Sequence, residues 1–335
     1  MSSGGPDLVL STAPFLKAAT STPRIMREVL VVALLVLLAA CWNFGISALV
    51  VVAAATAGAA GCEWAFTRAE SPSPLRDYSA VTTGVLLGLT LPPALPLWMA
   101  FLGGVVAVGL GKLIWGGLGQ NLFNPALVGR AFLQAAFPTA ITTWTPPAAP
   151  GSRWTLPDSL FAAPLMHADI DGVSAATPLG LAKFEHQLTE TAPLFVGQTA
   201  GSLGETSAAL LLLCGLWLAL RRIFDWRLPV STLLSVAVLS QGMHWLLPES
   251  APPATFMLFS GGLLFAAVFM VTDPVTTPTT PRGAWLFGAG TGALVVLIRL
   301  YGGLPEGMMY AVLLMNALTP HINRRSQRRP FGAVP

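Results

Sequence analysis

The sequence predicts an all-α integral membrane protein, and three observations lead to this fold class. Of the 335 residues, 54% are hydrophobic and only 10% are charged, whereas average soluble proteins carry about 25% charged residues. Ten segments are apolar over a length near the ~20 residues that a membrane-spanning helix needs. The basic residues gather on one side of these segments, as they do in membrane proteins with a fixed orientation.

Each predicted span is a mostly apolar run bounded by polar or turn-forming residues. The ten runs cover residues 27–43, 46–66, 78–93, 97–116, 124–138, 206–222, 229–248, 255–272, 283–302 and 306–322. Three of them contain prolines at an end: Leu91-Pro92-Pro93, Asn124-Pro125 and Thr272-Asp273-Pro274. Such interruptions leave backbone polar groups without helical partners, so we expect these segments to face protein or a cavity rather than lipid.

The positions of Lys and Arg orient the spans. With the N-terminus in the cytoplasm, fourteen basic residues fall on the inner side and three on the outer side, while Arg130 falls within a span. The three outer residues are Arg153, Lys183 and Arg299. We therefore predict a multi-pass membrane protein with both termini cytoplasmic and the loop 139–205 on the periplasmic or extracellular face.

The two halves of the chain share a sequence pattern. Residues 98–117 and 285–303 both begin with Trp, contain a Gly-rich middle and one basic residue, and end in Gly-Gly. The matched helices are five spans apart, and an odd separation reverses the orientation, which predicts a five-plus-five inverted repeat with interrupted helices. The alternative is a chance likeness between two Gly-rich membrane helices. The predicted divisions are a cytoplasmic segment 1–26, a first membrane repeat 27–138, the periplasmic loop 139–205, a second membrane repeat 206–322 and a basic cytoplasmic tail 323–335.

The run DGVSAATPLG, residues 171–180, lies in the one long polar segment of the chain. Pro178 disfavours helical dihedrals at Thr177, so we expect an extended Thr177 with an exposed hydroxyl. A threonine hydroxyl is a weak nucleophile unless it is activated. This favours modification of Thr177 by another enzyme over catalysis, and we predict no catalytic residue. An ordinary loop threonine is the alternative.

The run DGVSAATPL resembles the flavinylation motif of the RnfD/NqrB family, with Ala175 where that motif usually has glycine. Residues 116–138, 197–207 and 271–283 are also similar to family segments, in the expected order. The resemblance covers about residues 24–325. The first predicted helix starts near residue 27, without the longer N-terminal extension of NqrB proteins, which favours the RnfD side of the family.

The resemblance implies FMN attached to Thr177 through a phosphoester bond, within a motif formed by Asp171, Ser174, Ala176 and Pro178. The chain would then be a membrane electron-transfer subunit, not catalytic alone. The implied complex couples ferredoxin/NAD electron transfer to Na⁺ or H⁺ translocation. The implied partners are the other Rnf subunits, especially a periplasm-facing subunit with its own FMN, the flavin transferase that attaches the cofactor, and the lipid bilayer.

Asn121 and Asn124 are candidates for a second flavin site. Each side chain has both a donor and an acceptor, and their spacing places both on one side of a helical start. The pair therefore matches the polar edge of a flavin, and the resemblance implies a non-covalent riboflavin in this region. Asn124 before Pro125 is also a typical helix N-cap, and both roles are compatible.

Other polar and aromatic residues have two interpretations each. The aromatic residues of the outer loop either contact the isoalloxazine ring or pack the loop onto the helices: Trp144, Trp154, Phe161, Phe184 and Phe195. Glu205 either complements the dipole of the following helix or belongs to an anion-binding helix start. Asp273 is predicted to form a structural turn at the inner end of its span, with an ion site as the alternative.

Several classes of site and function are disfavoured. The three cysteines lie in apolar runs without CxxC spacing, and the four histidines are scattered, so we predict no metal site. The net charge of +3 gives no indication of nucleic acid binding. Without the threonine motif, the repeat with broken helices would favour a channel or solute transporter without a redox role. A structural membrane scaffold is a third alternative.

Overall fold

The structure, a computed structural model, describes residues 21–68, 74–149, 151–164, 175–197, 199–205 and 207–327. All regular secondary structure in these ranges is helical, so the predicted all-α class is confirmed. The longer helices are α1 (Thr22–Phe44), α2 (Ile46–Thr67), α3 (Ser79–Leu89), α4 (Leu97–Gly111), α5 (Pro125–Ala136), α9 (Ala208–Leu220), α10 (Arg227–Leu246), α13 (Pro281–Tyr301) and α14 (Met308–Ser326). The shorter elements are η1 (Pro74–Asp77), η2 (Leu113–Trp115), α6 (Pro138–Thr142), η3 (Asp158–Phe161), α7 (Pro178–Gly180), η4 (Leu181–Glu185), α8 (Thr191–Val196), η5 (Leu203–Glu205), α11 (Ala254–Phe259) and α12 (Leu263–Phe269).

Each of the ten predicted spans contains helix. Among the described residues, four helical segments are both long and apolar enough to cross a membrane: Thr22–Phe44, Ile46–Thr67, Leu97–Trp115 and Pro281–Tyr301. The apolar helices α3 and α9 are shorter, with 11 and 13 residues. Large apolar side chains such as Leu38, Leu213 and Leu220 are exposed by 64–72% along the helices, as a lipid-facing surface requires.

The third, fifth and eighth segments are all interrupted, but the break inside the eighth lies at Gly261 and not at the predicted Thr272-Asp273-Pro274. α3 ends at Leu89, directly before Leu91-Pro92-Pro93, and the fifth segment divides into α5 and α6 at Pro138. The eighth segment divides into α11 and α12. Between these two helices, Gly261 has a φ of +63°, a left-handed conformation that glycine adopts without strain. The break exposes the carbonyls of Met257 and Ser260, which accept hydrogen bonds from the Arg299 side chain of α13.

Close backbone contacts at glycines hold the long helices of each half together. In the first half, a Cβ on Gly58 of α2 would overlap the carbonyl of Phe101 in α4. In the second half, a Cβ on Gly292 of α13 would lie 2.6 Å from the carbonyl oxygen of Thr232 in α10, and Ser235 Oγ donates a hydrogen bond of 2.9 Å to the Ala289 carbonyl. Small residues permit this approach, which is typical of helix packing in membranes.

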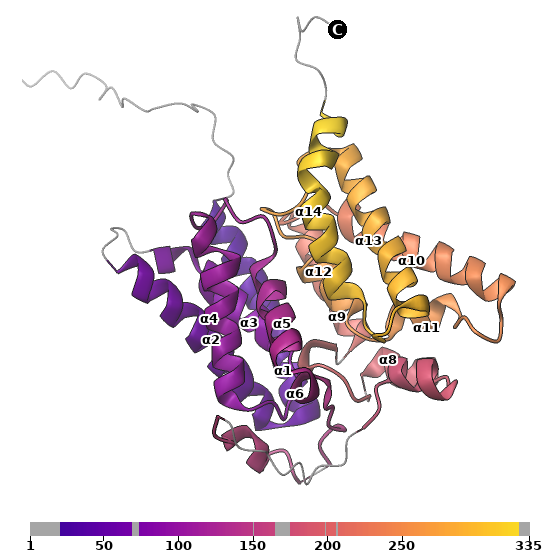
Figure 1. The fold of residues 1–335 in the computed structure, drawn as a ribbon, viewed down its shortest axis with the longest axis horizontal. Helices are drawn as coiled ribbons and strands as arrows, with labels where there is room; N and C mark the ends of the chain where they lie inside the picture. The colour runs from indigo at the N-terminus through magenta and orange to yellow at the C-terminus, as the bar shows by residue number, and fades with distance from the viewer. Residues whose placement is uncertain are drawn as a thin grey trace, which may run out of the picture.

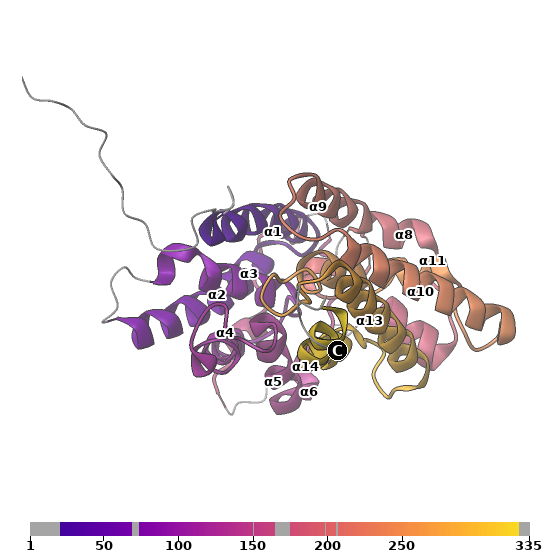
Figure 2. The ribbon, with the colours of Figure 1, turned by 90° about the horizontal axis from the view of Figure 1, so that it is seen from above.

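The helices form two groups that lie side by side. Figure 1 shows α1–α5 in one group and α9–α14 in the other, with the described chain beginning and ending at the same end of the molecule. α6 and α8 lie at the opposite end. Seen from above, α1 lies beside α9 and α5 lies beside α14 (Figure 2). In the described parts of the segment between α5 and α9, α6 therefore contacts the first group and α8 the second, at the end away from the described termini.

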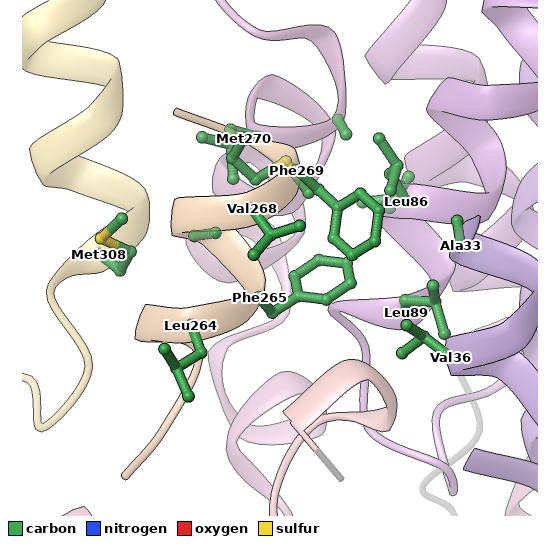
Figure 3. Packing of buried hydrophobic residues seen from close by; sticks show 14 of the residues in the cluster. Ala33, Val36, Leu86, Leu89, Leu264, Phe265, Val268, Phe269, Met270 and Met308 are labelled. Carbon is green, nitrogen blue, oxygen red and sulfur yellow. The ribbon is translucent and has the colours of Figure 1, made fainter. Parts of the chain in front are cut away.

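The core between the two groups is built on α12. Figure 3 shows Phe265 and Phe269 of α12 pointing toward Leu86 and Leu89 of α3, with Ala33 and Val36 of α1 behind them. The rings of Phe265 and Phe269 are 5.1 Å apart between centroids. η5 lies against the same surface, because the Leu203 amide donates a 3.1 Å hydrogen bond to the carbonyl of Leu91. Interrupted segments of both halves thus meet in the middle of the molecule.

Candidate functional site

Thr177 is extended but buried. Its dihedrals are φ −70° and ψ 154°, as the following proline predicts. Its side chain is only 6% exposed, and its Oγ1 accepts a 3.1 Å hydrogen bond from the amide of Gly180, the last residue of α7. The prediction of an exposed hydroxyl is therefore wrong, because the segment folds back as an N-cap and packs Leu179 against Leu194 and Phe256.

The motif around Thr177 is described in part. Ala176 is exposed and Pro178 is buried beside Thr177. The Ala175 amide donates a 2.9 Å hydrogen bond to the carbonyl of Trp144, which fixes the segment to the chain after α6. The predicted motif residues Asp171 and Ser174 lie outside the described residues.

The Thr177 side chain lines a cavity of about 390 Å³ between the two helix groups. The first half contributes Leu127, Arg130 and Gln134 of α5, and the loop contributes Trp144 and Phe184. The second half contributes Phe265 and Ala266 of α12 and Arg299 of α13. It also contributes Glu306 of the α13–α14 connection and Tyr310 in the first turn of α14. Ligand pockets usually measure about 300–1,000 Å³, so the cavity is large enough for a cofactor ring.

An ion pair across the cavity joins the two halves. Arg130 of α5 donates a 2.9 Å hydrogen bond to Glu306 in the α13–α14 connection. The two side chains are 11% and 19% exposed, so the pair is screened less than a surface pair. Oε1 of Glu306 has no hydrogen-bond partner among the described residues and is buried.

Arg299 carries a positive charge to the cavity wall. Its guanidinium donates to the carbonyls of Met257 (2.6 Å) and Ser260 (3.0 Å), which the break between α11 and α12 leaves unpaired. Its Nε is buried and has no partner within the described residues. The charge of Arg299 is therefore hydrogen-bonded to neutral groups, and no carboxylate of the described chain lies within ion-pair distance of it.

Glu205 ends η5, two residues before Ser207 caps α9. It therefore precedes the first turn of α9, and the predicted dipole role is wrong. Its carboxyl group fits between two glycines, because a Cβ on Gly201 or Gly262 would lie 2.9 Å from a carboxyl oxygen. Burial, reinforced by the charge of Glu306, raises the pKa of Glu205 to about 7, although Arg130 and Ser202 oppose the shift.

Lys183 fastens the segment after Thr177 to α13. Its ammonium group donates to the carbonyls of Arg299 (2.9 Å), Leu304 (3.2 Å) and Gly302 at the end of that helix. The last carbonyls of a helix lack helical partners and carry partial negative charge, so a cation is stabilised there. Sequence reasoning missed this contact, which joins residues more than 100 positions apart.

The predicted aromatic residues divide into two groups. Trp144 and Phe184 line the cavity. Trp154 and Phe161 are 82% and 65% exposed and lie outside the cavity wall, and Phe195 packs edge-on against Phe259. Sequence reasoning missed Phe265 and Tyr310 because both belong to segments that looked like ordinary apolar helix.

Asn121 and Asn124 are both buried and line a second cavity, of about 70 Å³, near α1 and α12. The N-cap prediction is confirmed, because Asn124 Oδ1 accepts from the amides of Ala126 (3.1 Å) and Leu127 (3.3 Å). Asn121 precedes the helix rather than starting it, and its Oδ1 is buried without a partner within the described chain. A cavity of about 70 Å³ is too small for a tricyclic flavin. The side-chain amides of Asn121 and Asn124 nevertheless match the donors and acceptors on the polar edge of a flavin ring.

Two further polar groups surround this second cavity. Lys112 and Glu63 form a buried ion pair, and Lys112 also donates a 2.5 Å hydrogen bond to Ser79. Asp273 forms the predicted turn, because its carboxylate accepts from the Val275 amide (3.1 Å) and the Thr276 hydroxyl (3.2 Å). The described residues contain no group of three or more His, Cys, Asp or Glu able to hold a metal ion.

The larger cavity fits FMN by its chemistry. A threonine hydroxyl lies on its wall, the aromatic faces of Trp144, Phe184 and Phe265 suit a planar ring, and the buried Nε of Arg299 lacks a partner among the described residues. A flavin phosphodiester carries one negative charge, which the guanidinium would stabilise.

Comparison with known proteins gives the family. The model of the NQR2, RnfD, RnfE family matches residues 9–332. The chain is 40% identical to a subunit of the ion-translocating oxidoreductase complex of Stutzerimonas stutzeri, over 93% of both chains. It is 36% identical to a subunit of the proton-translocating ferredoxin:NAD(+) oxidoreductase complex of Clostridium ljungdahlii, over 96% of both. It is 37% identical to a subunit of the Na(+)-translocating ferredoxin:NAD(+) oxidoreductase complex of Acetobacterium woodii, over 98% of this chain and 96% of that one. The chain therefore belongs to the NQR2, RnfD, RnfE family.

Proposed function

We propose that this chain is a membrane electron-transfer subunit that carries FMN covalently on Thr177. Its complex would couple ferredoxin/NAD electron transfer to the translocation of Na⁺ or H⁺. The names of the relatives support the complex, and the position of Thr177 on the wall of the inter-half cavity carries the flavin assignment. Bound FMN would supply one-electron transfer. The protein residues position it: Trp144 and Phe184 provide apolar faces, and Arg299 provides the positive charge.

The proposed topology has ten spans in a five-plus-five inverted repeat. Two observations support it. The second and fourth spans pack closely in the first half, as α2 and α4, and the seventh and ninth do so in the second half, as α10 and α13. The interrupted third and eighth segments meet between the halves, as α3 and α12 (Figure 3). In this topology both termini face the cytoplasm, and the Thr177 segment faces the periplasm of a bacterial inner membrane.

The periplasmic position determines the proposed partners. A flavin transferase outside the cytoplasm would attach FMN to Thr177, and an FMN-carrying subunit facing the periplasm would exchange electrons with it. Other Rnf subunits would complete the complex, and the exposed apolar helices would contact lipid or these subunits.

In-gel fluorescence tests the flavin assignment. The denatured wild-type chain, expressed with the flavin-attaching enzyme, should give a fluorescent band that Thr177→Ala abolishes. Thr142→Ala is the matched control, because Thr142 lines the same cavity, and its band should stay bright. A dark wild-type band would contradict the proposal and favour a channel or solute transporter without a redox role.

We also propose a non-covalent riboflavin beside Asn121 and Asn124, which requires the second cavity to widen. The support is the buried, unpartnered Oδ1 of Asn121 within the described chain. Asn121→Ala should lower the flavin released when the purified chain is denatured in acid. Asn316→Ala, at another buried asparagine in α14, should leave that amount unchanged. Equal release from wild type and Asn121→Ala would contradict this site.

A further inference from the structure

The cavity beside Thr177 contains a carboxyl group that the proposed electron transfer does not use. Glu205 lines this cavity together with Thr177, and its Oε1 is buried with no hydrogen-bond partner among the described residues. Gly201 and Gly262 leave just enough space for the carboxyl group, since a Cβ at either position would lie 2.9 Å from one of its oxygens. The backbone on both sides therefore fixes the position of the carboxyl group.

The charged groups facing Glu205 come from four other parts of the chain. Glu306 of the α13–α14 connection is the nearby acid, and its own ion pair is with Arg130 of α5. Arg299 of α13 is held by two backbone carbonyls. Glu185 of η4 lines the outer part of the cavity and is exposed. Glu205 therefore has no ion-pair partner of its own within the described residues, and the addition of negative charge to the cavity would favour its neutral form.

We infer that Glu205 binds a proton when the flavin on Thr177 accepts an electron, and releases that proton when the electron leaves. The inference rests on the proposed attachment of FMN. The electron comes from a one-electron carrier of a neighbouring subunit, and the proton comes from water on the outer side. An O–H bond forms on the carboxylate as the flavin is reduced, and it breaks when the flavin passes its electron on, so charge in the cavity stays balanced.

The pKa of Glu205, raised to about 7 by burial and Glu306, supports this role. A carboxyl group with a pKa near the working pH is partly ionised before reduction. A second negative charge in the same partly dry cavity repels a carboxylate far more strongly than it would in water, because the local dielectric constant is lower. Such repulsion shifts the group toward its protonated form.

Redox-induced infrared difference spectroscopy tests this role. The full chain, with FMN attached, is reduced electrochemically in detergent near pH 7. The reduced-minus-oxidised spectrum of wild type should gain the carbonyl stretch of a protonated carboxylic acid, and this band should shift in D₂O. Glu205→Gln should lose the band, whereas Glu185→Gln should keep it. Thr177→Ala lacks the covalent flavin, so its difference spectrum shows which bands do not depend on that flavin.

The outcomes separate this inference from the proposed function. A wild-type chain with a fluorescent band but no carboxylic acid signal on reduction would overturn the role of Glu205 and leave FMN attachment intact. Persistence of the signal in Glu205→Gln would overturn it as well. A wild-type chain with no covalent flavin would contradict the proposed function itself. Glu205→Asp, which keeps an acid on a shorter side chain, should retain a shifted signal if the glutamine variant fails to fold.

Discussion

Thr177 illustrates what a single residue's neighbours can and cannot predict. Pro178 follows it directly, so the extended backbone could be predicted from local sterics. Its burial could not, because it depends on Gly180, Trp144 and the α8–α11 surface, which the fold brings together. Glu205 is a similar case. Its sequence position before a helix suggested a dipole role, whereas the cavity that surrounds it is formed by both halves of the chain.

The raised pKa of Glu205 predicts how stability depends on pH. Its folded-state pKa of about 7 lies above the ordinary value of 4.5, so the folded chain binds more protons than the unfolded chain between these values. The free energy of unfolding should therefore fall as pH rises from about 4.5 to about 7, by at most a few kcal/mol from this group. Thermal unfolding followed by tryptophan fluorescence should show this loss in wild type.

The matched comparison is Glu205→Gln, which cannot ionise. As pH rises toward about 7, the Tm of the variant should increase relative to that of wild type. Above about pH 7 the difference between the two Tm values should stay constant. A difference that stays constant across this pH range and above it would contradict the raised pKa.

At the scale of elements, proline positions predicted the end of the third segment before Leu91-Pro92-Pro93 and the start of the fifth at Asn124-Pro125, whereas the breaks at Pro138 and Gly261 were not predicted. The partners of the freed backbone groups could not be predicted. Arg299 satisfies the break between α11 and α12, and Lys183 satisfies the end of α13. Both contacts join residues far apart in sequence, and both side chains looked like ordinary outer-side charges. The same two residues connect the Thr177 segment to the second half.

The Lys183 contact predicts an effect on flavin attachment. Because Thr177 is 6% exposed, we expect a transferase to reach it when the segment after it leaves α13. Lys183→Gln loses charge-assisted hydrogen bonds, each worth about 1.5–3 kcal/mol when buried, and Lys183 is only partly buried. Attachment of flavin to the purified, folded, flavin-free chain should therefore be several-fold faster in the variant. Lys183→Arg should react at the wild-type rate, and equal rates for all three chains would contradict this gating.

At the scale of the whole molecule, composition and basic-residue bias predicted a membrane protein, and four helices of the described chain are long and apolar enough to cross a membrane. The cavity could not be predicted, because its walls come from α5, α12, α13 and the connecting loop. Arg130 and Glu306 join the two halves across this cavity. We propose that flavin reduction shifts the halves relative to each other and so moves Na⁺ or H⁺, with this ion pair as one of the contacts that change.

Reconstituted complex tests this coupling. Wild type in sealed vesicles should build a cation gradient during electron transfer. Arg130→Gln should lower the number of cations moved per electron more than it lowers the rate of electron transfer. Arg153→Gln is the control, since Arg153 contacts the exposed Trp42 ring and does not line the cavity. Full turnover by wild type without any gradient would contradict the coupling.

Mass spectrometry of one peptide tests the central claim most directly. Trypsin cleaves after Arg153 and Lys183, and no Lys or Arg lies between them, so residues 154–183 form a single peptide containing the whole motif. In chain from cells that express the flavin-attaching enzyme, this peptide should carry FMN as a phosphoester that fragmentation locates on Thr177. An unmodified peptide, or a flavin located on Ser174, would contradict the account.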